Sequence, residues 1–483
     1  MQRAPKNITI TNRGSHMIAF ALRAFGACLL LLGLAACAPE PAATAPEKMP
    51  SPDTSTAKSD TQGAEFVRVQ GRQFVLDGKA YYPVGVNFWF GAYLGAEGEQ
   101  GDRTRLLKEL DLLHSLGVNN LRVLAVSEDS ELVRAVRPAI VNAKGEFNES
   151  LLQGLDFLLA EMAKRNMTAV LYLNNFWQWS GGMSQYVAWH KGTPVLDPDV
   201  TGEWNAFMQN SAEFYRIADA QVRYHQVIKT LTGRVNSITG IAYHQDPTIM
   251  SWQLANEPRP GSDADGRPNV EVYIQWIKTT ARLLHQLAPQ QLVSTGSEGV
   301  MGSIGDPAVY VAAHELPEVD YLTFHMWAKN WGWFDAKNPA ATFTGSLEKA
   351  AAYIDTHIDI ANRLGKPTVL EEFGLDRDGG AFAADSGTQY RDIYYQTVFN
   401  QLHERAVAGD AIAGYNIWAW GGYGRSQRAD FIWQPGDDFM GDPPQEPQGL
   451  NSVLASDAST LAIIKQSTAD FASLAVTEKT ALP

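Results

Sequence analysis

Eight short apolar runs, rich in β-branched and aromatic residues, alternate along this chain with segments of helical periodicity. The runs span residues 81–91, 118–126, 167–177, 248–258, 290–299, 319–327, 366–374 and 411–420. Between the first two, Leu106, Leu110 and Leu113 fall on one helix face, and Gly117 is a plausible C-cap. Eight strands alternating with helices predict an α/β fold, the (β/α)8 or TIM barrel. No segment carries the glycine-rich signature of a dinucleotide or nucleoside triphosphate site.

The segment ahead of the first run, "FVRVQGRQFVLDGKAYY", alternates apolar and polar residues around Gly71 and again before Asp77-Gly78. This pattern predicts a short N-terminal β-hairpin that leads into the barrel. We therefore expect residues 64–475 to form one (β/α)8 catalytic domain, followed by a C-terminal tail at residues 476–483.

The N-terminal part has a different composition. "RAFGACLLLLGLAAC" (23–37) has a positive charge, an apolar run too short to span a bilayer, and small residues before Cys37. We expect residues 1–37 to contain a signal peptide, for which Met17 is a natural start. Its end resembles the lipobox of bacterial lipoproteins, which implies lipidation of Cys37; an ordinary secretory signal is the alternative. Residues 38–63, rich in Pro, Ala, Ser and Thr, predict a disordered tether.

A signal peptide that ends in a lipidated cysteine implies an exported protein, anchored by lipid to the bacterial envelope. We expect the outer membrane, with the catalytic domain periplasmic or on the cell surface. The chain's only two cysteines lie within the first 37 residues, so the folded body has no disulfide framework. A net charge of −14 argues against nucleic acid and against direct adhesion to anionic lipid. Membrane contact is expected only through the anchor, and the protein is expected to be a monomer.

Polar residues gather where the predicted strands end, which is where TIM barrels carry their reactive groups. These residues are Arg122, Asn174, Asn175, Asn256, Glu257, Glu298, His325, Glu371, Glu372 and Trp418. Two carboxylates across a barrel mouth suit glycoside cleavage, in which one protonates the leaving oxygen and the other attacks or activates water. Arg122 is suitably placed to keep Glu372 ionised. Asn256 could bind the hydroxyl beside the reacting carbon.

The motifs "WQLANEP" (252–258) and "VLEEFG" (369–374) resemble the acid/base and nucleophile signatures of glycoside hydrolase family five. The resemblance implies a retaining double displacement without cofactor, with Glu257 as acid/base and Glu372 as nucleophile. The family's Glu-Phe-Gly pattern selects Glu372 over Glu371. Strand alternation agrees, because adjacent side chains point to opposite faces. The implied substrate-binding residues are Arg122, Asn174, Asn175, Trp177, Asn256, His325, Trp327 and Trp418, with Trp418 as the platform under the reacting sugar.

Within that family, "GVNFWFGAYLG", "NNFWQWSGG" and "HMWAKNWGWFD" resemble the subgroup that degrades β-1,4-mannan. The chain is most similar to bacterial, lipid-anchored, exo-acting β-mannosidases, whose loop after the last strand closes one end of the cleft. Residues 431–449 are the equivalent here, which implies release of mannose from chain ends. An endo-mannanase with an open cleft and a β-1,4-glucanase remain alternatives. His325-Met326-Trp327 replaces the family's usual His-x-Tyr, so its hydrogen bond to the nucleophile is missing or comes from an indole.

Two other classes of protein are less consistent with the sequence. A metal-dependent hydrolase needs clustered ligands, but the ten histidines form no His-x-His or His-Glu-x-x-His motif. We therefore expect no metal. A non-catalytic sugar-binding lipoprotein would keep the aromatic residues and lose one carboxylate, whereas this chain has both.

Overall fold

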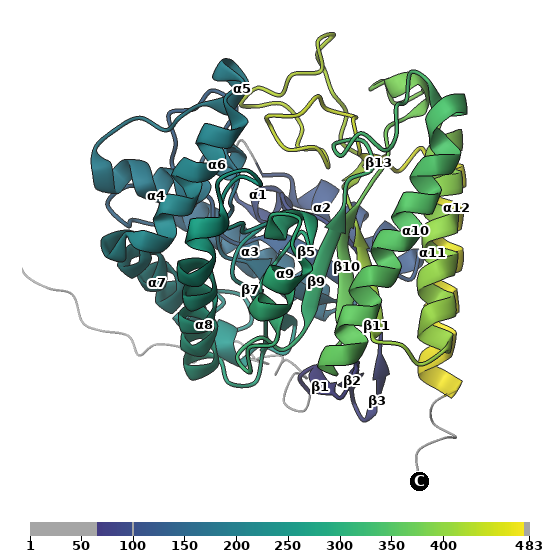
Figure 1. Ribbon diagram of the computed structural model, residues 1–483, viewed down its shortest axis with the longest axis horizontal. Helices are drawn as coiled ribbons and strands as arrows, with labels where there is room; N and C mark the ends of the chain where they lie inside the picture. The colour runs from purple at the N-terminus through teal and green to yellow at the C-terminus, as the bar shows by residue number, and fades with distance from the viewer. Residues whose placement is uncertain (1–64, 99–100, 478–483) are drawn as a thin grey trace, which may run out of the picture. The chain divides into compact units, whose positions relative to one another are not determined.

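The computed structural model describes residues 65–98 and 101–477. Eight parallel strands form one sheet, in the order β8-β7-β6-β5-β4-β11-β10-β9 (Figure 1). They are β4 (Val84–Asn87), β5 (Asn120–Leu124), β6 (Thr168–Tyr172), β7 (Ile249–Gln253), β8 (Leu292–Ser294), β9 (Leu322–Met326), β10 (Thr368–Phe373) and β11 (Ile412–Ile417). Each lies inside one of the eight predicted runs, which confirms the TIM barrel.

The two ends of this strand order also meet. The backbone N–H of Asp320 donates to the carbonyl of Val293 at 2.9 Å, and that of His325 donates to the carbonyl of Glu298 at 3.2 Å. These bonds join the chain around β8 to the chain around β9. The barrel is therefore nearly closed, so all eight strand ends point to one common mouth.

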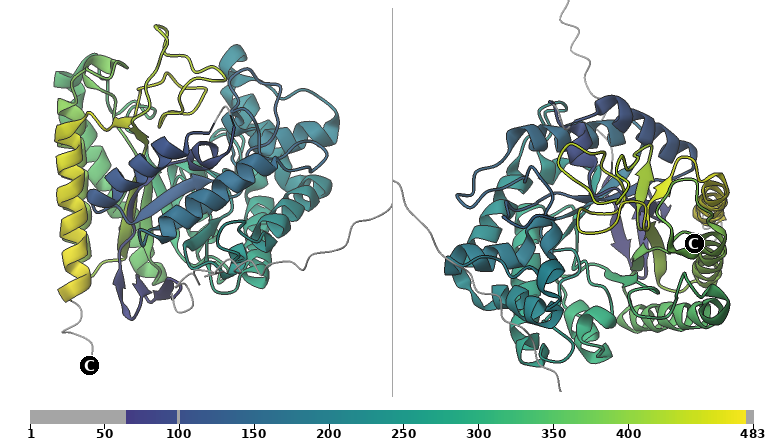
Figure 2. Two further views of the ribbon diagram at one scale, coloured as in Figure 1. Left: turned by 180° about the vertical axis from the view of Figure 1, so that it is seen from behind. Right: turned by 90° about the horizontal axis from the view of Figure 1, so that it is seen from above.

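Helices surround the sheet, as the view from above shows (Figure 2). The longer helices bury one apolar face each; in α8, for example, Tyr273, Trp276, Ile277 and Leu284 recur at helical spacing and are buried. The α-helices are α1 (Gly91–Gly95), α2 (Arg103–Ser115), α3 (Glu149–Ala163), α4 (Gly182–Lys191), α5 (Pro198–Thr201), α6 (Trp204–Ala212), α7 (Ala218–Gly233), α8 (Val270–Leu287), α9 (Pro307–His314), α10 (Pro339–Leu364), α11 (Gln389–Val407) and α12 (Ala458–Thr477). Short 3-10 turns are η1 (Gln178–Ser180), η2 (Glu213–Arg216), η3 (Tyr243–Gln245), η4 (Arg267–Asn269), η5 (Met301–Ser303) and η6 (Asp378–Gly380).

The observed N-terminal sheet has one strand more than the predicted hairpin. β1 (Arg68–Gln70), β2 (Gln73–Leu76) and β3 (Lys79–Tyr81) form a three-stranded antiparallel sheet. The third strand follows Asp77-Gly78, beyond the alternation that predicted the hairpin. Phe74 of β2 packs edge-on against Tyr321, with ring centroids 5.2 Å apart. The small sheet therefore covers the end of the barrel opposite the mouth (Figure 1).

Two long connections rise above the mouth. The chain between β6 and β7 carries α4 to α7, and the chain after β11 makes an excursion between β12 (Trp420–Gly422) and β13 (Val453–Leu454) (Figures 1 and 2). β12 and β13 pair in parallel. These two connections can thus form opposing walls over the strand ends.

The predicted signal peptide, Cys37 and the tether at 38–63 lie outside the described residues, as does most of the predicted tail. No helix in the two described ranges is both long enough and apolar enough to span a bilayer.

Candidate active site

A cavity of about 590 Å³ opens at the carboxyl ends of the barrel strands, within the size range of small-molecule sites. It is lined by residues of the strand ends and of both long connections. They are Trp177, Gln178, Trp179, Asp199, Trp204, Asn256, Glu257, Arg259, Glu298, Trp327, Asn330, Trp331, Glu372, Trp418, Pro443, Gln445, Glu446 and Pro447. The predicted carboxylate pair, Glu257 and Glu372, therefore lies in one cavity.

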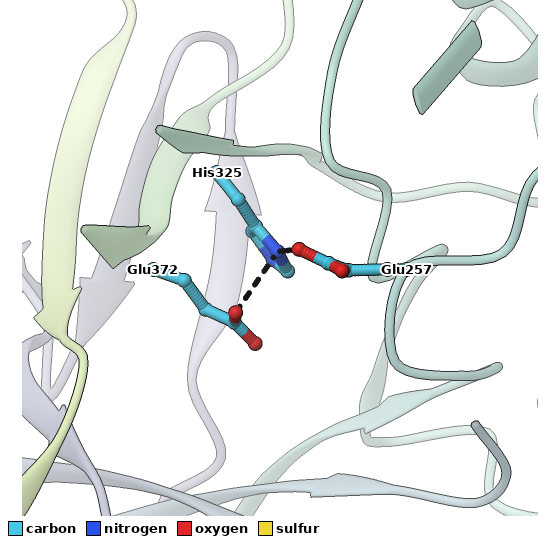
Figure 3. A group of neighbouring side chains, drawn as sticks. All are labelled: Glu257, His325 and Glu372. Atoms are coloured by element: carbon cyan, nitrogen blue, oxygen red, sulfur yellow. Dashed lines mark hydrogen bonds and ion pairs between the residues drawn. The ribbon is translucent and has the colours of Figure 1, made fainter. Parts of the chain in front are cut away.

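Glu257 and Glu372 approach each other across His325 (Figure 3). The His325 Nδ1 atom lies 2.7 Å from Glu257 Oε1 and 3.3 Å from Glu372 Oε2. A carboxylate oxygen from each glutamate and this ring nitrogen all lie within 4.8 Å of one another. That spacing fits retaining glycosidases, whose carboxyl groups are about 5–5.5 Å apart, and is too short for the roughly 6.5–9.5 Å of inverting ones.

The carboxyl group of Glu257 is held by three donors. Trp177 Nε1 donates to Oε2 at 2.5 Å, while Trp327 Nε1 donates to Oε1 at 3.0 Å. Burial lowers the pKa of His325 to about 4, so its ring is neutral at pH 7 and Nδ1–H can donate to Oε1. The Trp327 indole N–H therefore bonds to the acid/base Glu257 and not to the nucleophile Glu372.

The backbone also constrains Glu257. Its φ of +50° lies in the left-handed region, which residues other than glycine seldom occupy. The residue follows β7, and Pro258 comes directly after it. Strain of this kind persists only where the surrounding structure enforces it, and it concentrates at functional sites.

Arg122, which is fully buried on β5, organises the other carboxylate. Its Nη1 is ion-paired with Glu372 Oε1, and its Nη2 and Nε donate at 2.8 Å to Asn256 Oδ1 and Gln253 Oε1. Burial raises the pKa of the Glu372 carboxyl well above its usual value, and the nearby Glu257 raises it further, while Arg122 opposes both effects. The ion pair with Arg122 thus favours the ionised form of a carboxyl group that burial alone would keep protonated.

Glu371 departs from the predicted alternation. The register between β10 and β9 shifts between Leu370 and Glu372, so both glutamates turn into the barrel. Glu371 Oε2 accepts from Gln253 Nε2 at 2.6 Å and lies 3.7 Å from Arg122 Nε. The alternation argument is thus wrong at this bulge. The two residues differ instead in depth, because Glu372 lines the cavity and Glu371 lies beneath it.

The predicted substrate-binding residues divide into two layers. Trp177, Asn256, Trp327 and Trp418 line the cavity. Among the residues that the structure describes, the cavity lining does not include Arg122, Asn174, Asn175 or His325. The two asparagines support the upper layer: Asn175 Oδ1 accepts from Asn256 Nδ2 at 3.2 Å and from the Trp177 backbone at 3.0 Å. Asn174 Oδ1 in turn accepts from the Asn175 backbone at 2.7 Å.

Two lining residues, Asp199 and Trp204, had no signal in the sequence. They come from the connection between β6 and β7, for which the sequence indicated only helical periodicity. Pro443, Gln445, Glu446 and Pro447 belong to the 431–449 loop that was expected to border the cleft.

Arg259 holds Glu298 and places its guanidinium 5.5 Å from the centre of the Trp177 ring. It therefore fixes the indole that contacts Glu257.

The same three side chains in Figure 3 are the one group in the described part of the chain close enough to hold a metal ion. Their donor set does not fit a cation well. Glu257 Oε1 already accepts N–H groups from Trp327 and His325, and Glu372 Oε1 is paired with the positive Arg122. A divalent cation here would displace those donors and face the guanidinium charge.

Comparison with known proteins gives a consistent result. A model of the family described as glycoside hydrolase family 5 beta-mannosidase-like matches residues 64–475. A glycoside hydrolase family 5 mannosidase from Rhizomucor miehei is 35% identical, with a TM-score of 0.77 over 85% of this chain and 99% of that one. Mannan endo-1,4-beta-mannosidase 7 of Arabidopsis thaliana is 29% identical over 73% of this chain and 77% of its own length. An endo-1,4-beta-mannanase from Rhizomucor miehei, 21% identical, shares the fold with a TM-score of 0.61 over 85% and 100%.

Proposed function

Because this chain belongs to the β-mannosidase-like family of glycoside hydrolase family 5, we propose that it hydrolyses β-1,4-mannosidic bonds with retention and releases mannose from chain ends. The chain is a glycoside hydrolase of the mannosidase and mannanase type. The observation that carries the retaining mechanism is the separation of Glu257 and Glu372, whose facing oxygens lie within 4.8 Å on the cavity floor.

In the first step, a Glu372 carboxylate oxygen attacks the anomeric carbon and the glycosidic bond breaks. Glu257 gives its proton to the departing oxygen, so the shortened chain leaves as an alcohol and a glycosyl ester remains on Glu372. In the second step, Glu257 takes a proton from water, whose oxygen attacks the anomeric carbon and frees Glu372. Arg122 stabilises the carboxylate that Glu372 must present at the start and regain at the end.

The loop that borders the cavity supports action at chain ends. Its base is fixed by the buried Asp442, whose carboxylate accepts N–H groups from Gly449 at 2.8 Å and Asn451 at 2.7 Å. Gln448 Nε2 donates to the carbonyls of Asp442 and Pro443 at 2.9 and 3.2 Å. The residues between them therefore form a firm wall, and a firm wall at one end of a cavity favours binding of a chain terminus.

An endo-acting mannanase is the second candidate, because curated relatives such as the Arabidopsis protein carry that name. The test is a timed digest of linear β-1,4-mannohexaose with products separated by size, and cellohexaose as the control. Mannose from the first time point, with successively shorter chains, is the expected result. Early mannobiose and mannotriose would establish an endo-mannanase, and cleavage of the glucan alone would keep the mechanism and replace the substrate.

We also propose export and lipid anchoring through Cys37, from the lipobox-like end of the 23–37 segment. In a bacterial host, the wild-type protein should incorporate labelled palmitate and sediment with the envelope. Cys37→Ser should lose both properties. Label in the Cys37→Ser variant, or its absence in the wild type, would overturn the anchor.

A further inference from the structure

We propose that Trp204, the first residue of α6, is the stacking platform of a second leaving-side subsite for a linear β-1,4-linked oligosaccharide. This inference rests on the proposed glycosidase function and extends it. The subsite would bind the second sugar unit beyond the bond that is cleaved. Trp204 lines the cavity, and 41% of its surface is exposed.

The ring of Trp204 makes T-shaped contacts with two neighbouring rings. Its ring centroid lies 6.2 Å from that of Trp177 at an interplanar angle of 68°, and 6.3 Å from that of Phe207 at 80°. Among the aromatic contacts of residues 65–98 and 101–477, none stacks in parallel on Trp204. T-shaped contacts cover less of a ring than parallel stacking does, and the 41% exposure of Trp204 leaves indole surface for the C–H face of a sugar.

Trp177 has no such freedom. Its ring stacks against Phe207 at 15°, the Arg259 guanidinium sits 5.5 Å from its centre, and its Nε1–H is bonded to Glu257. Trp177 is thus occupied by its contacts with the acid/base. Trp204 is the next ring outward from Glu257 along this wall.

The order of these contacts indicates which side of the cleaved bond Trp204 serves. Glu257 delivers its proton to the leaving oxygen, so the wall that continues from Glu257 through Trp177 faces the departing chain. The predicted platform under the reacting sugar, Trp418, belongs instead to the chain after β11 and contacts Trp327, with centroids 5.8 Å apart. Trp204 and Trp418 therefore serve different ends of the substrate.

The backbone under Trp204 is firmly placed. Phe207, one turn along α6, is fully buried, and the short helix α5 before it is tied to the wall by Gln178 Nε2, which donates to Asp199 Oδ2 at 2.9 Å. Asp199 also lines the cavity. An exposed indole on a rigid support loses little conformational freedom when a ligand covers it.

The experiment compares kcat/KM of wild type, Trp204→Ala and Trp204→Phe on an aryl β-mannoside, mannobiose, mannotriose and mannotetraose. We expect the loss in Trp204→Ala to grow with chain length and to step at mannotriose, by about three- to tenfold through KM. Trp204→Phe, which keeps a smaller ring, should recover part of the loss. Tyr423→Ala is the matched control, because Tyr423 is 44% exposed and lies outside the lining set.

A loss of the same size on mannobiose and mannotriose would overturn the position in the second subsite. If the loss in kcat/KM were the same on all four substrates, the aryl mannoside included, the platform itself would be overturned. Failure of the proposed function has a different signature, since the wild type would then leave every mannoside intact. If the wild type cleaves only β-1,4-glucans, the same comparison is made on cellobiose, cellotriose and cellotetraose, with the same two outcomes. Thermal unfolding of each variant controls for loss of folded protein.

Discussion

Arg122 and Trp204 belong to one site, yet Arg122 is fully buried and Trp204 is 41% exposed. Arg122 represents the floor, formed by the ends of the barrel strands and the polar layer beneath the cavity, where side chains hydrogen-bond to one another. Trp204 represents the rim, formed by the β6–β7 connection and the excursion after β11, where side chains are oriented by packing and keep a free face. We therefore expect substitutions in the floor to lower kcat, and substitutions in the rim to change which chain lengths and products are preferred.

The largest effect is expected at the floor. Glu372→Ala should lower kcat by about 10⁴-fold or more, because the nucleophile is lost. Azide should restore activity and give a glycosyl azide of inverted configuration, detected by NMR. Glu371→Gln is the matched control on the adjacent residue below the cavity. Rescue of a Glu371→Ala variant by azide, with none for Glu372→Ala, would exchange the two roles.

A second floor prediction concerns Arg122→Lys. Lysine cannot reproduce the fork that pairs with Glu372 and bonds to Asn256 and Gln253. We expect kcat to fall about 10²-fold and the free energy of unfolding to fall by about 3–5 kcal/mol, measured by denaturant titration. Arg103→Lys, at a more exposed ion pair with Glu97, should change stability by less than about 1 kcal/mol. Equal effects at the two positions would contradict a floor held by mutual bonding.

At the rim, Asp442→Asn should loosen the loop that walls the cavity. The substitution replaces one carboxylate oxygen, which accepts the Gly449 or the Asn451 N–H group, by an NH2 donor and should cost about 1–3 kcal/mol in unfolding free energy. Hydrolysis of mannohexaose should then yield more mannobiose and mannotriose relative to mannose. Asp438→Asn, an exposed change in the same segment, should leave products unaltered. An unchanged product ratio in Asp442→Asn would show that chain-end preference does not depend on this wall.

The smallest effect concerns pH. Burial raises the pKa of Glu446 to about 8, and Asp442 adds to the rise while Lys329 opposes it. The folded protein then holds a proton that the unfolded chain releases near pH 4.5, so this group's stabilisation is present at low pH and declines as pH rises toward 8. After allowance for partial exposure, we expect about 1–2 kcal/mol less stability at pH 8 than at pH 5. Glu446→Gln should flatten that difference in denaturant titrations at both pH values; an identical slope would refute the prediction.

The floor was largely predictable from the sequence, and the rim was not. Apolar runs located all eight strands, and side chains that end a parallel barrel strand must meet at its mouth, which placed Glu257 and Glu372 together. The same reasoning could not see the register shift at Leu370, because a bulge depends on the neighbouring strand and not on local pattern. It also could not separate the cavity surface from the layer beneath, where Arg122, Asn174, Asn175 and His325 lie.

Trp204 escaped prediction for another physical reason. It lies in a connection of helical pattern, where an aromatic residue more often packs into the core, and only the three-dimensional path of α5 and α6 brings it to the cavity. The third strand of the N-terminal sheet was missed because its residues 79–81 continue directly into the first barrel run.

The excursion after β11 leaves and returns at a single place. Trp420 pairs with Val453 and Gly422 pairs with Leu454, so the ends of the intervening chain are fastened side by side. Closing a loop whose ends already meet costs little more as its length changes. Changes of length are therefore tolerated best away from Phe439 and Gly441, which contact Trp89 and hold the segment against the barrel.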